Sequence, residues 1–186
     1  MFVVLEGIDG CGKDTQIQLL RNNLQFEYFK YPTSKFTILK DYLNGKVSLD
    51  KKGLFLLFLA DIADEQEKIA NANFAIADRY VYSTIAYELG ALSFEKSKEI
   101  VEAIGFIKPD LVLLLDISPE TAQKRKAKQK KPDIYESNTK YLKEVRERFL
   151  RLAKDSFHAR RWVVINADAP IDQVNKEITK EISKLL

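Results

Sequence analysis

Short apolar runs separated by amphipathic segments constrain the fold of this chain more than any other feature of its sequence. Four of the runs lack polar alternation and therefore predict strands buried on both faces: FVVL at 2–5, FAIA at 74–77, LVLLL at 111–115 and WVVI at 162–165. A fifth strand is predicted for FEYFKY at 26–31. Strands buried on both faces belong in parallel sheets that helices cover on either side.

The segments between these runs predict helices. Apolar residues recur at helical spacing after the first run and again near the end of the chain: Ile17, Leu20 and Leu24, then Val174, Ile178, Ile182 and Leu185. The stretch at 138–154 is amphipathic and rich in helix formers. Ser118 followed by Pro119 fits the start of another helix. Repeated strand–helix units predict an α/β fold of three layers with right-handed crossovers.

Length and composition indicate one ordinary globular domain spanning 1–186. The chain has 186 residues, 46% of them apolar and 31% charged, with a formal net charge of +3, which allows anionic ligands without requiring nucleic acid. Cys11 is the single cysteine, which favours a reducing compartment. The apolar run at 53–60 is too short to cross a bilayer, and the first residues carry no secretory signal pattern. We therefore expect a soluble cytoplasmic protein.

The stretch VVLEGIDGCGKDTQIQLL at 3–20 contains the G-x-x-x-x-G-K pattern of a phosphate-binding loop, formed by Gly7, Gly12 and Lys13. Glycines let backbone N–H groups turn inward around phosphate oxygens, while the following helix and the lysine add positive charge. The alternative is a glycine turn that only ends a strand. The expected contacts to a nucleotide's phosphates are Gly7, Ile8, Asp9, Gly10, Cys11, Gly12, Lys13, Asp14 and Thr15.

Asp14 occupies the position after the loop lysine, where a serine or threonine hydroxyl normally ligates magnesium. A carboxylate is a hard oxygen ligand that suits Mg²⁺, and an anion is favoured in the first turn of a helix. We therefore expect Asp14 to bind the metal directly, with Thr15 as a nearby substitute. The alternative is that Asp14 only caps the helix.

Five segments in order along the chain resemble the thymidylate kinase family. They are LEGIDGCGKDTQ at 5–16, ADRYVYSTIAYE at 77–88, KPDLVLLLDISPETAQKR at 108–125, DIYE at 133–136 and WVVINADAPIDQV at 162–174. The resemblance implies a P-loop nucleoside monophosphate kinase fold with a five-stranded parallel sheet flanked by helices. It also implies transfer of the ATP γ-phosphate to dTMP, giving dTDP, with Mg²⁺ and usually in a homodimer.

The same resemblance implies roles for residues at the ends of the first and third predicted strands. Asp9 matches the carboxylate that approaches the acceptor's 3′-hydroxyl and phosphate, and Arg79 should hold the acceptor phosphate in a bidentate grip. Asp78 would orient magnesium-bound water or Arg79, so with Asp14 it is a candidate metal residue. An ordinary salt bridge closing the strand end is the alternative for Asp78 and Arg79. The catalytic candidates are Lys13, Arg79, Asp78 and Asp9.

Three further side chains match the family's acceptor site. Phe58 matches the ring that stacks on thymine, and Tyr87 matches the aromatic residue under the deoxyribose, which disfavours a 2′-hydroxyl. Ser83 is expected to meet the base or the sugar. Without the resemblance, Phe58 would be interpreted as a residue of the hydrophobic core and Ser83 as a helix cap.

The segment at 124–136 is the candidate lid. Six of its residues are cationic, namely Lys124, Arg125, Lys126, Lys128, Lys130 and Lys131. Phosphoryl transfer needs positive groups around the moving phosphoryl, so we expect a lysine of the lid to supply the catalytic cation. By resemblance, Arg125 lies against adenine opposite the loop at 166–170, and Tyr135 lies near the acceptor. A nucleic-acid patch is the alternative, but aromatic residues do not interleave with these lysines.

Two positions depart from the family pattern on the acceptor side. Ile62 stands where the family commonly has an arginine that hydrogen-bonds the pyrimidine, which favours dUMP or another monophosphate as a rival acceptor. Lys35 takes the place of an arginine that grips the acceptor phosphate. A rival of another class is a P-loop switch without transferase activity, but NKEI at 175–178 lacks the aspartate of the guanine-reading motif.

Overall fold

A computed structural model describes residues 1–127 and 139–185 of the chain. Five parallel strands form one sheet in the order β2-β3-β1-β4-β5. Their bounds are β1 Phe2–Glu6, β2 Glu27–Lys30, β3 Ala75–Asp78, β4 Leu111–Asp116 and β5 Trp162–Asn166. Every predicted strand is present within a residue or two of its expected ends, and all four pairings are parallel.

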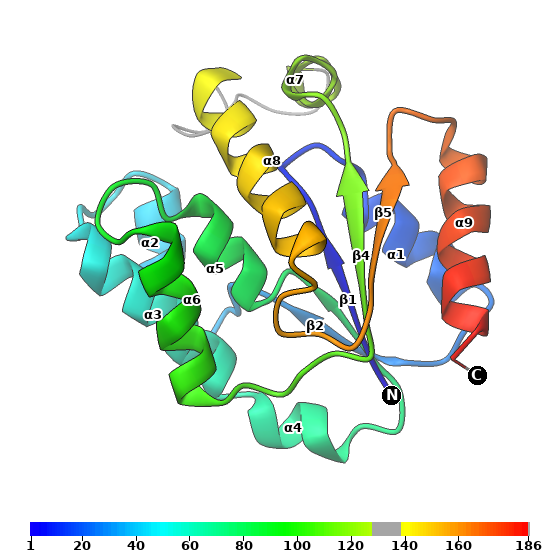
Figure 1. Ribbon diagram of the computed structural model, residues 1–186, viewed down its shortest axis with the longest axis horizontal. Helices are drawn as coiled ribbons and strands as arrows, with labels where there is room; N and C mark the ends of the chain where they lie inside the picture. The colour runs from blue at the N-terminus through cyan, green and yellow to red at the C-terminus, as the bar shows by residue number, and fades with distance from the viewer. Residues whose placement is uncertain (128–138, 186) are drawn as a thin grey trace.

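Helices cover both faces of this sheet (Figure 1), so the α/β fold of three layers is confirmed. In Figure 1, α1 and α9 lie on one side of the strands, and α5 and α8 lie on the other. The helices are α1 Lys13–Arg21, α2 Thr37–Leu43, α3 Lys51–Ala63, α4 Gln66–Asn71, α5 Val81–Tyr87, α6 Phe94–Ile104, α7 Pro119–Ala127, α8 Thr139–Lys154 and α9 Ile171–Ser183. Within the described ranges, no helix has the length and apolar character needed to span a membrane.

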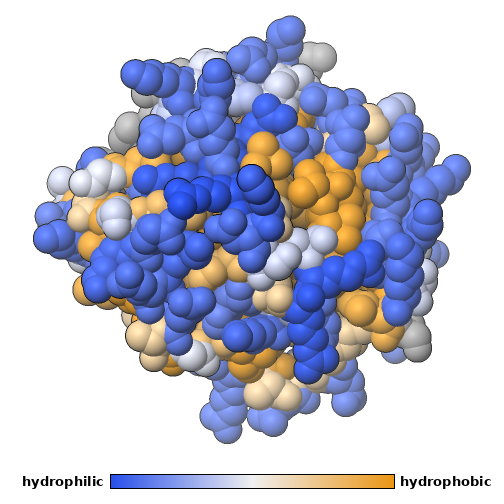
Figure 2. Space-filling view, in the orientation of Figure 1, coloured by the Kyte–Doolittle hydropathy of each residue, from blue (hydrophilic) through white to orange (hydrophobic). Residues whose placement is uncertain are grey.

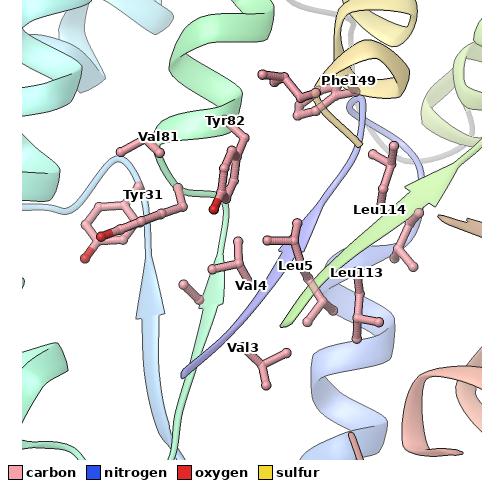
Figure 3. Close-up of a cluster of buried hydrophobic side chains, with 14 of the residues drawn as sticks. Val3, Val4, Leu5, Tyr31, Val81, Tyr82, Leu113, Leu114 and Phe149 are labelled. Carbon is pink, nitrogen blue, oxygen red and sulfur yellow. The ribbon is translucent and has the colours of Figure 1, made fainter. Parts of the chain in front are cut away.

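The core fills the space between the three inner strands and the helices on either side. Figure 3 shows Val3, Val4 and Leu5 of β1 among buried side chains from neighbouring elements, including Phe149 of α8 and Tyr82 of α5. These five side chains are almost wholly removed from solvent. Burial of this much apolar surface is the dominant favourable contribution to folding, and it fixes the strand ends from which the site is built.

The prediction that the run at 162–165 is buried on both faces is wrong. β5 is the last strand of the sheet, and the side chain of Val164 is 48% exposed. Figure 2 shows an apolar area over this strand among polar side chains. A run of four apolar residues cannot by itself separate an inner strand from an edge strand, because the strand order is a property of the whole sheet.

Helix ends follow local chemistry with small differences from the predicted periodicity. α1 ends at Arg21, so Leu24 lies beyond it and packs against the core from the following loop. The Ser118 hydroxyl accepts a hydrogen bond from Thr121 N at 3.2 Å, which confirms the predicted start of α7 before Pro119.

Candidate active site

A cavity of about 1050 Å³ opens at the carboxyl ends of β1, β2 and β3. Ligands bind at this edge of a parallel sheet because the loops that leave the strands converge there. Most of the predicted site residues line it, namely Asp9, Gly10, Cys11, Gly12, Lys13, Asp14, Thr15, Phe58, Asp78, Arg79, Ser83, Tyr87 and Arg125. The structure therefore brings residues from four separate segments of the chain to one cavity.

Three predicted residues do not line the cavity, and one lies outside the described residues. Gly7 and Ile8, the first two residues of the loop, are buried. Lys35 lies apart from it, with Nζ 2.5 Å from Asp64 Oδ2. Tyr135 falls in residues 128–138, as do three of the lid lysines, and these are outside the described part of the chain.

The phosphate loop has a backbone that glycine permits and other residues do not. Gly10 has a φ of +87°, and a Cβ added to it would stand 2.7 Å from the carbonyl oxygen of Ala122 in α7. Gly7 has a φ of +143°, and its Cβ would stand 2.6 Å from the carbonyl oxygen of Leu115. The loop is thus pressed against β4 and α7, which explains two of its glycines by close approach as well as by conformation.

Lys13 folds back over its own loop. Its Nζ donates a hydrogen bond to the carbonyl oxygen of Gly7 at 3.1 Å, lies 3.6 Å from Cys11 Sγ and is 4.0 Å from Asp78 Oδ1. The side chain is nearly buried, so its charge acts where little water screens it. This position suits an ammonium that meets phosphate oxygens at the cavity floor.

Arg79 lies at the centre of a group of polar side chains in the cavity wall. Its Nη2 donates to Asp9 Oδ1 at 2.6 Å, its Nη1 donates to Ser83 Oγ at 2.8 Å, and its guanidinium lies 5.2 Å from the ring centre of Tyr87. Burial disfavours the charge, but the combined effects of Asp9, Tyr87, Glu6 and Asp78 outweigh it and raise the pKa of Arg79 above its ordinary value. The φ of Arg79 is +71°, a conformation that non-glycine residues rarely adopt and that recurs at functional sites.

Tyr87 completes this group from the end of α5. Its hydroxyl donates to Asp9 Oδ2 at 3.3 Å and accepts from Asp9 N at 3.2 Å. The helix α8 holds Tyr87 in turn, because the hydroxyl of Tyr141 donates to the Tyr87 carbonyl oxygen at 2.9 Å and Arg148 donates to the carbonyl oxygen of Glu88. The amphipathic pattern predicts α8 but not these polar contacts, since they depend on how α8 packs on α5.

Glu6 is a buried residue of the site that the sequence reasoning missed. Its carboxylate accepts hydrogen bonds from Tyr80 N at 2.8 Å, Ser83 N at 3.1 Å and Ser83 Oγ at 2.6 Å. Burial raises the pKa of Glu6 to about 7, against the opposing effects of Arg79 and of the hydrogen bond from Ser83. A charged residue directly after the apolar run at 2–5 was the signal available in the sequence.

The hydroxyl of Ser83 therefore hydrogen-bonds to two protein side chains, the carboxylate of Glu6 and the guanidinium of Arg79. Ser83 does not cap α5, whose N-cap is Tyr80. In this arrangement Ser83 fixes the orientation of the Arg79 guanidinium, because the hydroxyl accepts from the arginine while it donates to the carboxylate.

Lys30, the last residue of β2, also escaped the sequence reasoning. Its Nζ lies 2.5 Å from Asp14 Oδ1 and 3.2 Å from Asp78 Oδ2, so it bridges two carboxylates at the cavity wall. Burial of Asp14 opposes ionisation, but the hydrogen bond and the charge of Lys30 prevail and lower the pKa of Asp14. The pairing comes from the register of the sheet, in which Lys30 of β2 stands beside Asp78 of β3.

The carboxylates of Asp14 and Asp78 fit a magnesium ion. Asp78 Oδ1 is buried without a hydrogen-bond partner, and the Asp14 side chain is 73% exposed in the cavity wall. The N-cap of α1 is Gly12, with no side-chain cap hydrogen bond. Within residues 1–127 and 139–185, no group of three or more His, Cys, Asp or Glu side chains could hold a metal. Mg²⁺ is commonly held by one or two carboxylates together with substrate phosphates and water, so this pair suffices.

The far wall of the cavity is apolar. Phe58 of α3 is half-buried there, and Ile62, one turn further along the same helix, is 1% exposed. The loop after β2 is tied to this helix because Asp61 accepts from Thr33 N at 2.7 Å and from Thr33 Oγ1 at 2.5 Å. A flat, apolar ring can lie against this wall while its polar edge faces the rest of the cavity.

Arg125 lies at the opposite end of the cavity. Its Nη2 donates to the carbonyl oxygen of Ala167 at 2.9 Å, which sets the guanidinium beside the loop that follows β5. Asp168, Ala169 and Pro170 of this loop line the same cavity. The described part of the predicted lid is the end of α7, from Lys124 to Ala127.

Comparison with known proteins supports the family resemblance over nearly the whole chain. A family model described as thymidylate kinase matches residues 5–178. A probable thymidylate kinase of Methanocaldococcus jannaschii is 35% identical over 184 residues, covering 96% of this chain and 93% of that protein. The thymidylate kinase of Plasmodium falciparum is 31% identical over 196 residues, covering 99% of this chain and 90% of that protein.

A solved structure agrees with these relatives. The thymidylate kinase of Candida albicans superimposes with a TM-score of 0.77 at 25% identity, covering 98% of this chain and 91% of that one. The fold, the phosphate-loop pattern and the polar group around Arg79 thus occur together in one chain. The chain belongs to the thymidylate kinase family.

Proposed function

We propose that this protein transfers the γ-phosphoryl group of ATP to dTMP, giving dTDP and ADP, in a reaction that requires Mg²⁺. Membership of the family supports the enzyme class and the acceptor, and it does not favour a P-loop switch, a nucleic-acid binder or another monophosphate. The observation that carries the proposal is that the phosphate loop and Arg79 line one cavity, where Arg79 pairs with Asp9 of the loop.

The donor would bind along the phosphate loop. Backbone amides between Gly7 and Gly12 and the ammonium of Lys13 would hold its phosphates. Adenine would lie between Arg125 and the loop after β5, whose residues line the same cavity. Bound Mg²⁺, held by Asp14 and Asp78 with phosphate oxygens and water, would neutralise charge on the donor phosphates.

The acceptor would bind between Arg79 and the apolar wall. The guanidinium of Arg79 would turn its fork to the acceptor phosphate, with Asp9 and Ser83 holding it in plane. Phe58 would stack on the base, and Tyr87 would lie under the sugar. Ile62 supplies apolar surface next to the stacked ring.

The chemistry needs little beyond placement and charge. An oxygen of the acceptor phosphate forms a bond to the γ-phosphorus while the bond from that phosphorus to the β–γ bridging oxygen breaks, and ADP leaves. The attacking oxygen is already anionic, so no side chain has to remove a proton. Lys13, Arg79 and a lid lysine would stabilise the charge that spreads over the moving group.

The assembly and location follow the family resemblance. We expect a homodimer in the cytoplasm, and light scattering coupled to size-exclusion chromatography measures the mass in solution. A mass of one chain at micromolar concentration would contradict the dimer.

A panel of nucleoside monophosphates tests the function. Each is incubated with ATP, with and without Mg²⁺, and ADP and nucleoside diphosphate are measured by chromatography. We expect dTMP to give the highest kcat/KM and turnover to stop without the metal. The Candida albicans relative is described as having broad substrate specificity, so dUMP and dGMP belong in the panel. Dominant turnover of AMP, GMP or CMP would refute the acceptor assignment.

A further inference from the structure

We propose that Lys30 is a positioning residue whose ammonium occupies the place of the divalent cation between Asp14 and Asp78, so that the protein binds metal well only together with a nucleotide. The inference rests on the proposed magnesium site and adds a mechanism that governs when this site fills. It comes from three observations on the side chains around β2.

The first observation is the bridge itself. Lys30 Nζ contacts Asp14 Oδ1 at 2.5 Å and Asp78 Oδ2 at 3.2 Å, and these are the two carboxylates that fit the metal. A lysine amine is ordinarily protonated at neutral pH, and two carboxylates within 3.2 Å favour that charged form. The bridge is therefore cationic at neutral pH, and it neutralises part of the charge that would attract a metal ion.

The second observation is the incomplete satisfaction of Asp78. Its Oδ2 has partners in Lys30 and, at 3.5 Å, in the hydroxyl of Tyr28, whereas its buried Oδ1 has no hydrogen-bond partner and lies 4.0 Å from the ammonium of Lys13. A buried carboxylate oxygen without a hydrogen bond is costly, and a cation in direct contact with it removes that cost. The site is therefore built for a second occupant that reaches deeper than the ammonium does.

The third observation is the exposure of the Lys30 side chain. Half of the side chain is exposed, and it lies in the cavity wall. Its flexible four-carbon stem allows the ammonium to move away from the carboxylates. A metal ion held by Asp14 and Asp78 together would compete with the ammonium that now bridges them, because like charges at contact distance repel strongly in a partly buried site. The ammonium must move when the metal enters.

Nucleotide phosphates offer the displaced ammonium a new partner inside the same cavity. Without phosphates, Mg²⁺ has to expel Lys30 from two carboxylates and leave it unpaired. With phosphates, the metal brings further oxygen ligands, and the ammonium moves to an anion. Lys30 thus couples metal binding to nucleotide binding, which protects the site from metal ions that arrive alone.

Titration with Mn²⁺ tests this coupling without any catalysis. Electron paramagnetic resonance measures the loss of the free Mn²⁺ signal as the full chain is added in the absence of nucleotide. We expect Lys30→Met to bind Mn²⁺ about tenfold more tightly than the unaltered protein, the effect of one nearby charge on an ionic equilibrium. Lys30→Arg is the matched control, because it keeps a cation and should bind as weakly as the unaltered protein.

Two further titrations decide whether the tighter Mn²⁺ binding of Lys30→Met has the proposed cause. In Lys30→Met combined with Asp14→Asn, the gain should disappear because one of the two carboxylates is gone. With ATP present, the gain of Lys30→Met should shrink or reverse, since the ammonium then pairs with phosphates. Unchanged or weaker Mn²⁺ binding by Lys30→Met, or a gain that persists without Asp14, would overturn the inference.

A measurement on the unaltered protein guards against a misfolded variant. The side-chain ammonium resonance of Lys30 in nuclear magnetic resonance should shift when Mg²⁺ and ADP are added together and stay in place with Mg²⁺ alone. A shift with Mg²⁺ alone would contradict the coupling. These outcomes are independent of the kinase proposal, which fails only if the unaltered protein does not phosphorylate dTMP.

Discussion

Glutamine in place of Glu6 should make the stability of this protein much less dependent on pH. The Glu6 carboxylate is buried at the end of β1, where it accepts hydrogen bonds from Tyr80 N and from the backbone and hydroxyl of Ser83. Glutamine has nearly the same shape, keeps one oxygen acceptor and cannot ionise. The substitution therefore removes the titration and leaves most of the packing in place.

The sign of this pH dependence follows from the direction in which the pKa of Glu6 is shifted. Burial raises the pKa of Glu6 from 4.5 to about 7. Between these values the folded state retains a proton that the unfolded chain releases, so the unfolding free energy of the unaltered protein falls as pH rises through this window. For a shift of this size, the contribution of Glu6 changes by about 2 kcal/mol between about pH 5 and about pH 7.5.

Urea unfolding of both proteins across this range measures the effect. The unfolding free energy of Glu6→Gln minus that of the unaltered protein should rise by about 2 kcal/mol from about pH 5 to about pH 7.5, while other titrating groups cancel. Ser83→Ala is a useful comparison, because it removes a hydrogen bond that favours the charged carboxylate and should extend the window to higher pH. A difference that stays level with pH, or one that falls, would refute the reasoning.

Three substitutions test the site itself. Arg79→Lys keeps the charge but loses the fork that Asp9 holds, and steady-state kinetics should show kcat/KM for dTMP lower by about 10- to 100-fold; a loss below about twofold would count against a phosphate grip. Tyr87→Phe removes both hydroxyl contacts to Asp9, so the acceptor KM should rise by about fivefold with a smaller change in kcat. Asp14→Ala should raise the Mg²⁺ concentration that supports half-maximal turnover, and an unchanged magnesium dependence would eliminate its metal role.

The strands and the phosphate loop could be predicted because their signals are local. Apolar runs of four or five residues mark β1, β3 and β4 with errors of a residue or two at their ends. The glycines of the loop follow from backbone geometry that only glycine adopts. Family resemblance added Arg79 and Tyr87, which the structure brings to the same cavity.

The partners of these residues could not be predicted, because they depend on which strands are neighbours. Lys30 meets Asp78 because β2 and β3 are paired in that register, and the sequence order alone does not fix this. Glu6 meets Ser83 because the end of β1 lies next to the first turn of α5. Lys35 was expected at the acceptor phosphate but pairs with Asp64, since the loop after β2 carries it away from the cavity.

Binding of a single molecule that joins adenosine to thymidine through a chain of phosphates tests the central claim most directly. If one cavity seats a donor on the phosphate loop and an acceptor on Arg79, such a molecule should bind with one copy per chain in calorimetry. It should also bind at least about 100-fold more tightly than ATP or dTMP alone, because the second contact becomes intramolecular. An affinity no better than that of ATP alone, or two copies per chain, would contradict the account.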